Sequence, residues 1–73
     1  MPEHIEWIET SSTLIKRHRW HDNVLDVEFP NGDCWSYTQV SRETYNSMRN
    51  APSVGQYFWK HIRNNDAYGR SMV

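Results

Sequence analysis

The sequence has little cysteine, glycine or proline and no long apolar run: one Cys, three Gly and three Pro occur among 73 residues. A single cysteine excludes an internal disulfide framework. No stretch reaches the roughly 20 apolar residues that a membrane-spanning helix needs. The first ten residues, MPEHIEWIET, also lack the basic start and apolar centre of a secretion signal. We therefore expect a soluble protein in a reducing, cytoplasmic compartment.

Charge of one sign is also scarce, because eight Lys and Arg face nine Asp and Glu, for a net charge of -1. This balance argues against a protein that binds nucleic acid mainly by neutralising its phosphate charges with Lys and Arg. Aromatic residues, by contrast, are plentiful: four Trp, four Tyr and two Phe in a chain that is only 37% hydrophobic. We expect one small domain with an aromatic core and aromatic side chains left over for its surface.

The pattern of apolar residues changes near Val40, from alternation before it to helical spacing after it. In the segment VLDVEF, Leu25, Val27 and Phe29 share one face and acidic residues occupy the other. This alternation predicts a half-buried strand.

The segment FPNGDCWSY, residues 29–37, allows two registers for the next strand. If residues 31–32 alone form the turn, Trp35 and Tyr37 lie on the charged face of the sheet. If residues 30–32 form the loop, proline and glycine occupy the positions that such a loop favours. The second register is predicted, and it pairs Trp35 with Val27 and Tyr37 with Leu25.

The preceding segment is predicted to pair with the same strand through a two-residue turn at Asp22 and Asn23. This register places Trp20 across from Leu25 on the core side. It also places opposite charges side by side on the other face. The predicted charge pairs are Arg19 with Asp26 and Arg17 with Glu28.

Two short helices are predicted after the strands. The first begins at Ser41 as N-cap, carries Tyr45 and Met48 on one face, and ends near Asn50. The second begins with a capping pattern at Ser53 and Gln56. Its apolar stripe has a spacing of four and consists of Val54, Phe58 and Ile62.

The predicted fold class is therefore α+β: a small antiparallel β-meander followed by two short helices packed on one face. Residues 1–11 are predicted to form an N-terminal segment that can add an edge strand. Residues 12–63 form the domain, and residues 64–73, which lack periodicity, form a mobile tail.

Metal and catalytic sites are poorly supported. His18 and His21 have H-x-x-H spacing, but the predicted register sends His18 and Cys34 to opposite faces, and no second cysteine completes a tetrahedral set. Cys34 with His61 or His18 is the only nucleophile and base combination, with nothing local to support it. We expect no metal, no cofactor and no enzymatic activity.

Surplus aromatic residues favour a protein-binding surface. Trp7 and Trp59 have no assured position in the core, and partly exposed tryptophans often anchor protein interfaces. The predicted partner-binding residues are Trp7, Trp59, Lys60 and Arg63.

The alternative is an RNA-binding or nucleotide-binding module, because basic residues are interleaved with aromatic ones in the run KRHRWH and in the second helix. Internal pairing of Arg17 and Arg19 weakens this reading. The residues that would bind nucleic acid are Lys16, His18, Lys60, His61 and Arg63.

In this order, the strand, the glycine turn, the aromatic pair and the two helices resemble the KTSC domain, a small module also found at the C-terminus of some lysyl-tRNA synthetases. The resemblance covers most of residues 12–63, and Trp35 and Trp20 stand where that family usually has Tyr. It is carried by Leu25, Val27, Phe29, Gly32, Trp35, Tyr37, Val40, Tyr45, Ala51, Ser53, Gly55, Phe58, Ile62 and Arg63. The resemblance to the KTSC domain implies the fold and suggests RNA binding. It identifies no catalytic residue in this sequence.

In length, and as a free-standing module, the chain also resembles small phage transcription regulators that bind bacterial RNA polymerase. That resemblance implies a monomeric, non-enzymatic regulator in the cytoplasm of an infected bacterial host. It would bind a polymerase subunit and inhibit initiation, with antitermination as a further effect. Nucleic acid would be a secondary partner, and no membrane would be involved.

Overall fold

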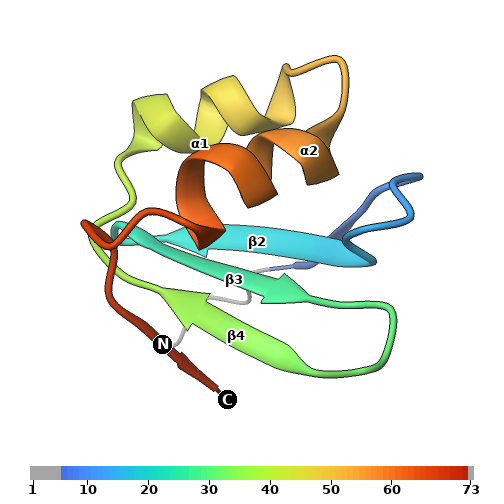
Figure 1. Cartoon of the computed structure of the whole chain (residues 1–73), viewed down its shortest axis with the longest axis horizontal. Coiled ribbons are helices and arrows are strands. Elements are labelled where there is room, and N and C mark those ends of the chain that lie inside the picture. The colour runs from blue at the N-terminus through green and yellow to red at the C-terminus, as the bar shows by residue number, and fades with distance from the viewer. Residues whose placement is uncertain (1–5, 73) are drawn as a thin grey trace.

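The protein is built on a five-stranded antiparallel sheet in the order β1-β2-β3-β4-β5. The structure is a computed structural model that describes residues 6–72. Both helical segments lie between β4 and β5 in the chain and cover one face of the sheet (Figure 1). The strands are β1 (Ile8–Glu9), β2 (Arg17–His21), β3 (Val24–Glu28), β4 (Cys34–Tyr37) and β5 (Arg70–Met72), and the helices are α1 (Arg42–Arg49), α2 (Val54–Phe58) and the π-helix η1 (Trp59–Arg63). The predicted α+β meander is confirmed.

The three-residue loop sets the register of β3 and β4 as predicted. Gly32 has a φ of 95°, in the left-handed region that glycine tolerates, and the Phe29 amide donates to the Asp33 carbonyl at 2.8 Å. The pairs are Val27 with Trp35 and Leu25 with Tyr37. Both aromatic side chains therefore lie on the face that the helices cover.

The turn at Asp22 and Asn23 is also confirmed, and both residues have positive φ, at 51° and 62°. It aligns Trp20 with Leu25, Arg19 with Asp26 and Arg17 with Glu28. On the outer face of the sheet, Arg19 Nε lies 2.9 Å from Asp26 Oδ2, and Arg17 forms an ion pair with Glu28. The basic run is thus partly neutralised within the sheet.

Serine side chains start both α-helices. Ser41 accepts a hydrogen bond from the Thr44 amide at 3.1 Å, and Ser53 accepts one from the Gln56 amide at 3.3 Å. The predicted stripe of Val54, Phe58 and Ile62 comes from two helical segments, because α2 ends at Phe58 and residues 59–63 form the π-helix η1. Phe58 and Ile62 are buried and Val54 packs against the core, so the stripe faces the sheet as expected.

The core is aromatic and small, and it lies between the sheet and the helices. The Tyr37 and Phe58 rings meet edge to face at 5.1 Å, and Phe29 packs against Phe58 at 5.8 Å. The buried core residues are Ile15, Leu25, Val27, Tyr37, Val40, Tyr45, Met48, Phe58 and Ile62.

The edge strands come from the segments at the two ends of the described chain. Residues 8–9 form β1 beside β2, and residues 70–72 form β5 beside β4. The strand at residues 70–72 was not predicted, because residues 64–73 were expected to form only a mobile tail. The backbone of these residues pairs with β4, but all three side chains are exposed. The segment therefore lacks the alternation of buried and exposed residues from which a strand is predicted. Within residues 6–72, no helix is long and apolar enough to cross a membrane.

We predict that Gly55→Ala destabilises the domain, although alanine is the better helix former. A Cβ at position 55 would clash with Ser12 Oγ and lie 2.8 Å from Leu14 Cβ, so the loop before β2 would have to shift. The expected loss is about 1–3 kcal/mol of unfolding free energy by urea titration. The exposed neighbour substitution Gln56→Ala is the control, and equal stability of the two variants would contradict the close approach.

Candidate functional site

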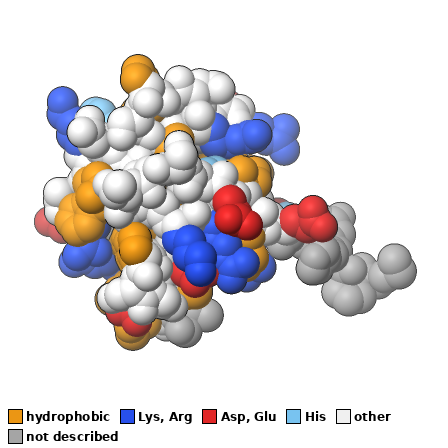
Figure 2. Space-filling model, turned by 90° about the vertical axis from the view of Figure 1, so that its right-hand side faces the viewer, with side chains coloured by type: hydrophobic (Ala, Val, Ile, Leu, Met, Phe, Trp, Pro, Cys, Tyr) orange, Lys and Arg blue, Asp and Glu red, His pale blue; other side chains and the backbone are white. Residues whose placement is uncertain are grey.

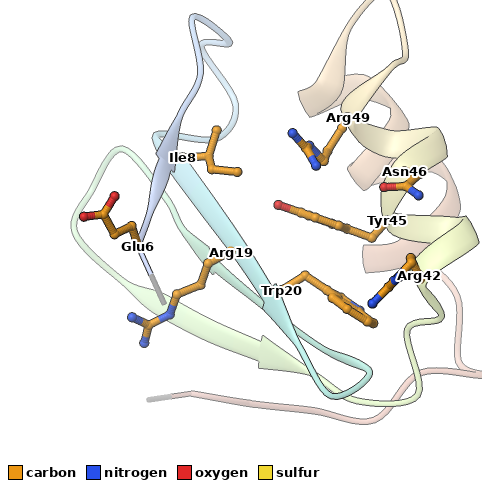
Figure 3. Close-up of a pocket in the computed structure, with 8 residues that line it drawn as sticks. All are labelled: Glu6, Ile8, Arg19, Trp20, Arg42, Tyr45, Asn46 and Arg49. Carbon is orange, nitrogen blue, oxygen red and sulfur yellow. The ribbon is translucent and has the colours of Figure 1, made fainter. Parts of the chain in front are cut away.

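A groove of about 450 Å³ lies between α1 on one side and strands β1 and β2 on the other (Figure 3). We call it the arginine groove, and it is lined by Glu6, Ile8, Arg19, Trp20, Arg42, Tyr45, Asn46 and Arg49. In Figure 3, Arg42, Tyr45 and Arg49 project from α1, whereas Arg19 and Glu6 extend away from the helix. Arg42 and Arg49 thus bring two positive charges to the α1 side of the groove, while Arg19 and Glu6 bring one charge of each sign to the opposite side.

A stack of two rings forms the floor of the arginine groove. Trp20 and Tyr45 lie nearly parallel, with centroids 6.0 Å apart and 15° between the planes. Arg42 Cζ lies 5.6 Å from the Trp20 ring, and Arg49 Cζ lies 5.6 Å from the Tyr45 ring. The Trp20 indole also donates to the Val40 carbonyl at 2.7 Å, which fixes its orientation.

Beneath the groove, His18 Nδ1 lies 2.8 Å from the Tyr45 hydroxyl. Burial, with a further contribution from the positive charge of Arg49, lowers the pKa of His18 from 6.5 to about 4. Burial also raises the pKa of Tyr45, and Arg49 opposes this change. Both groups are neutral near pH 7, so the arginines supply the positive charge of this groove.

A second groove, of about 470 Å³, lies at the end of the sheet where the β3–β4 loop meets η1. We call it the Trp59 groove, and it is lined by Thr13, Leu14, Phe29, Pro30, Asn31, Asp33, Trp35, Trp59 and Arg63. Arg63 Cζ lies 4.1 Å from the Trp59 ring centroid and 5.7 Å from that of Phe29. Leu14 is 37% exposed at this site. The groove is mainly aromatic and aliphatic, with one guanidinium stacked on it.

Trp59 differs from Trp20 in its hydrogen bonding. Its Nε1 is buried and finds no hydrogen-bond acceptor within the described part of the chain. The Trp20 indole, by contrast, has the Val40 carbonyl as acceptor. The core hydroxyl of Tyr37 is likewise buried without a partner among these residues, so the feature is shared by two aromatic side chains.

The four predicted partner-binding residues do not form one surface. Trp59 and Arg63 are stacked together, and Lys60 is exposed on the same π-helix. Trp7 is elsewhere, half-buried over the outer face of the sheet, where its ring lies 4.7 Å from Arg17 Cζ and 4.2 Å from Arg19 Cζ.

The residues predicted to bind nucleic acid are also dispersed. His18 is only 3% exposed and lies beneath Tyr45. Lys16 is exposed, and its Nζ lies 3.9 Å from Glu28 Oε2. His61 is exposed on η1 and packs on Tyr57, with centroids 4.4 Å apart. Figure 2 shows basic side chains at separate places, mixed with acidic and apolar ones, on the face that it presents.

Sequence reasoning assigned no binding role to Arg42 or Arg49. Their signal was present in the segment RETYNSMR, where positions 42, 45, 46 and 49 recur at spacings of three and four and so share one helical face. The opposing wall could not be deduced in the same way, because Ile8 reaches the groove only through the pairing of β1 with β2.

No set of three His, Cys, Asp or Glu side chains within residues 6–72 is arranged to hold a metal ion. His18 and Cys34 occupy opposite faces of the sheet, because His18 aligns with Val27 and Cys34 aligns with Glu28.

Comparison with known families and structures gives consistent matches. A profile of the KTSC domain matches residues 11–68. The crystal structure of a KTSC domain protein from Yersinia pestis superposes with a TM-score of 0.83, at 20% identity, over 96% of this chain and 99% of that one. At this identity the likeness concerns the fold.

Two proteins named lysine–tRNA ligase are also similar in sequence. Those of Trichormus variabilis and of a Nostoc species are each 32% identical over 63 residues, which cover 84% of this chain. The chain spans only 11% of the length of either ligase. The match therefore concerns one small domain within these larger proteins.

We predict that His18 makes the domain less stable in acid. The unfolded chain binds a proton at His18 near pH 6.5, but the folded chain does so only near pH 4. Protonation therefore favours unfolding between these values, and the contribution of His18 is constant above pH 6.5. Allowing for solvent screening, we expect about 1–2 kcal/mol less unfolding free energy at pH 4 than at pH 6.5.

Urea titrations of the wild type and of His18→Gln across this range measure the effect as a difference between the two proteins, which removes the contribution of carboxylates. The variant is expected to lose this part of the pH dependence, while exposed His61→Gln keeps it. Identical pH profiles for the wild type and His18→Gln would contradict the assignment.

Proposed function

The chain belongs to the KTSC domain family, and from this premise we propose that it is a non-enzymatic transcription regulator that docks on bacterial RNA polymerase through the Trp59 groove. In this proposal the regulator is phage-encoded and acts in the cytoplasm of the infected host. It inhibits initiation by occupying or remodelling a surface of one polymerase subunit, and the same contact alters termination.

The observation that carries the proposal is the Trp59 groove itself. It combines a concave aromatic surface, a partly exposed Leu14 and a guanidinium stacked on an indole. Trp and Arg are the residues most enriched among those that dominate binding energy at protein interfaces.

The choice of RNA polymerase rests on the resemblance to small phage regulators, together with the near-neutral charge. A net charge of -1 suits a protein partner better than a long nucleic acid. Lys60 is exposed beside Trp59 and would contribute to the polar rim of the contact. Trp7 would add a second contact only if the partner also reached the outer face of the sheet.

The alternative function is an RNA-binding or nucleotide-binding accessory module. The names of the two similar ligases favour it, because those proteins are named for tRNA. Of the residues proposed for this role, Lys60, His61 and Arg63 come from one π-helix and lie near one another in the chain. His18 would contribute only indirectly, because it is buried.

We predict that Trp59→Ala weakens binding to purified bacterial RNA polymerase by about 30-fold, the size expected of an interface residue worth about 2 kcal/mol. Affinity is measured by biolayer interferometry, with nuclease-treated polymerase. Gln56→Ala, an exposed change on α2 outside the groove, is the matched control and is expected to bind as the wild type does. Circular dichroism verifies that each variant is folded.

Two outcomes would count against this proposal. One is full affinity in a folded Trp59→Ala variant, which would exclude the Trp59 groove as the contact. The other is no binding of the wild type to polymerase at all, which would remove the partner. Trp7→Ala, measured in parallel, reports whether the outer face of the sheet contributes.

If the alternative is right, binding to single-stranded RNA will weaken steeply with salt, by about tenfold or more between 50 and 200 mM. Fluorescence polarisation with a labelled RNA oligonucleotide measures this slope. The double variant Lys60→Gln with Arg63→Gln is expected to reduce the slope, because two phosphate contacts are lost. No detectable RNA binding at 50 mM salt would contradict the alternative.

A further inference from the structure

We propose that the arginine groove binds an acidic peptide segment, with Arg42 and Arg49 each holding a carboxylate and Ile8 packing against an aliphatic side chain between them. This site lies apart from the Trp59 groove, and the two grooves share no lining residue. The inference therefore goes beyond the proposed function and does not depend on it.

The two arginines are spaced for two separate anionic groups. They are seven positions apart in α1, which places their backbones about 10 Å apart along the helix. Both side chains are exposed, and neither has a carboxylate within ion-pairing distance among residues 6–72. A guanidinium offers a planar pair of N–H donors that matches a carboxylate.

The position of Arg42 strengthens the argument. It is the first residue of α1, directly after the N-cap Ser41, where the positive end of the helix dipole meets its charge. A cation there costs some helix stability, whereas an anion is stabilised there. A carboxylate bound to Arg42 would therefore relieve an unfavourable interaction that the free protein carries.

The stacked rings favour a peptide over RNA. Bases bind such surfaces by stacking on open aromatic faces. In this groove Tyr45 is only 5% exposed, one of its neighbours is the nearly parallel Trp20 ring, and a guanidinium lies near each of the two rings. Little ring surface remains for a base, but the N–H groups of the arginines remain available.

The apolar wall also indicates a peptide. Ile8 is 40% exposed on a strand of only two residues, and in Figure 3 its side chain points towards α1 across the groove. An aliphatic side chain inserted between Ile8 and Tyr45 would remove this apolar surface from water. A volume of about 450 Å³ accommodates a few side chains.

The test uses a fluorescein-labelled peptide with the core Glu-Ser-Leu-Ser-Glu, within a glycine–serine context. In an extended chain the two glutamates and the leucine between them point to the same side, and the glutamates lie about 13 Å apart. Long arginine side chains reach this span from backbones about 10 Å apart. Fluorescence polarisation gives the affinity of the full chain, and amide chemical shifts in NMR spectra locate the site. We expect shift changes in β1 and α1.

Arg42→Gln and Arg49→Gln are each expected to weaken peptide binding by about tenfold, the effect of losing one charge-assisted hydrogen-bonded pair. Replacing both glutamates of the peptide by glutamine should have at least the same effect. Arg70→Gln is the matched control, because it removes the same charge outside this groove and should leave affinity within about twofold.

Four results with the peptides or with RNA would overturn the proposal. They are no binding of the peptide at millimolar concentration, shift changes clustered away from α1 and β1, equal affinity for the glutamine peptide, and tighter binding of an octauridylate at the same arginines. Inorganic phosphate is titrated as well, and if it binds as tightly as the peptide the site is a simple anion site and the proposal fails. Because RNA polymerase takes no part in these assays, their failure leaves the docking experiment unaffected.

Discussion

The alignment of β3 with both of its neighbours is the constraint on which the rest of the structure depends. Leu25 lies between Trp20 and Tyr37, so three core side chains meet on the same face. A slip of one residue would turn those side chains outward and bring the charged pairs of the outer face into the core. The two turns prevent this slip. Each turn contains residues with positive φ, at Asp22, Asn23 and Gly32, and few other residue types adopt that conformation readily. The turns are therefore fixed at these positions in the chain.

Both grooves follow from the small size of the layer that covers the sheet. The helices α1 and α2 have eight and five residues, so they bury the central strands but leave surface at both ends. One end exposes an aromatic cluster around Trp59, and the other exposes the side of α1 that faces β1. The surplus of aromatic residues is thus divided between a compact core and two recessed surfaces with different charge.

Local chemistry explains what could be predicted. The strand register followed from turn residues, and the starts of both helices followed from Ser41 and Ser53. The strand β5 was missed because it is held by backbone pairing and all three of its side chains are exposed. The π-helix was missed because the spacing of apolar residues was interpreted with the α-helical period only. The arginine groove was missed because it depends on two segments more than 30 positions apart in the chain, α1 and β1, which are brought together only by the sheet.

The π-helix η1 lets the Trp59 groove tolerate a change in chain length. Its hydrogen bonds span one more residue than those of an α-helix, so deleting one residue here could restore a regular helix without breaking it. Arg63 would then follow Trp59 at a spacing of three residues in place of four, and both spacings put the two side chains on one face of a helix. Relatives one residue shorter in this turn would therefore share both the scaffold and the stacked pair, so an alignment gap here would not mark loss of the surface.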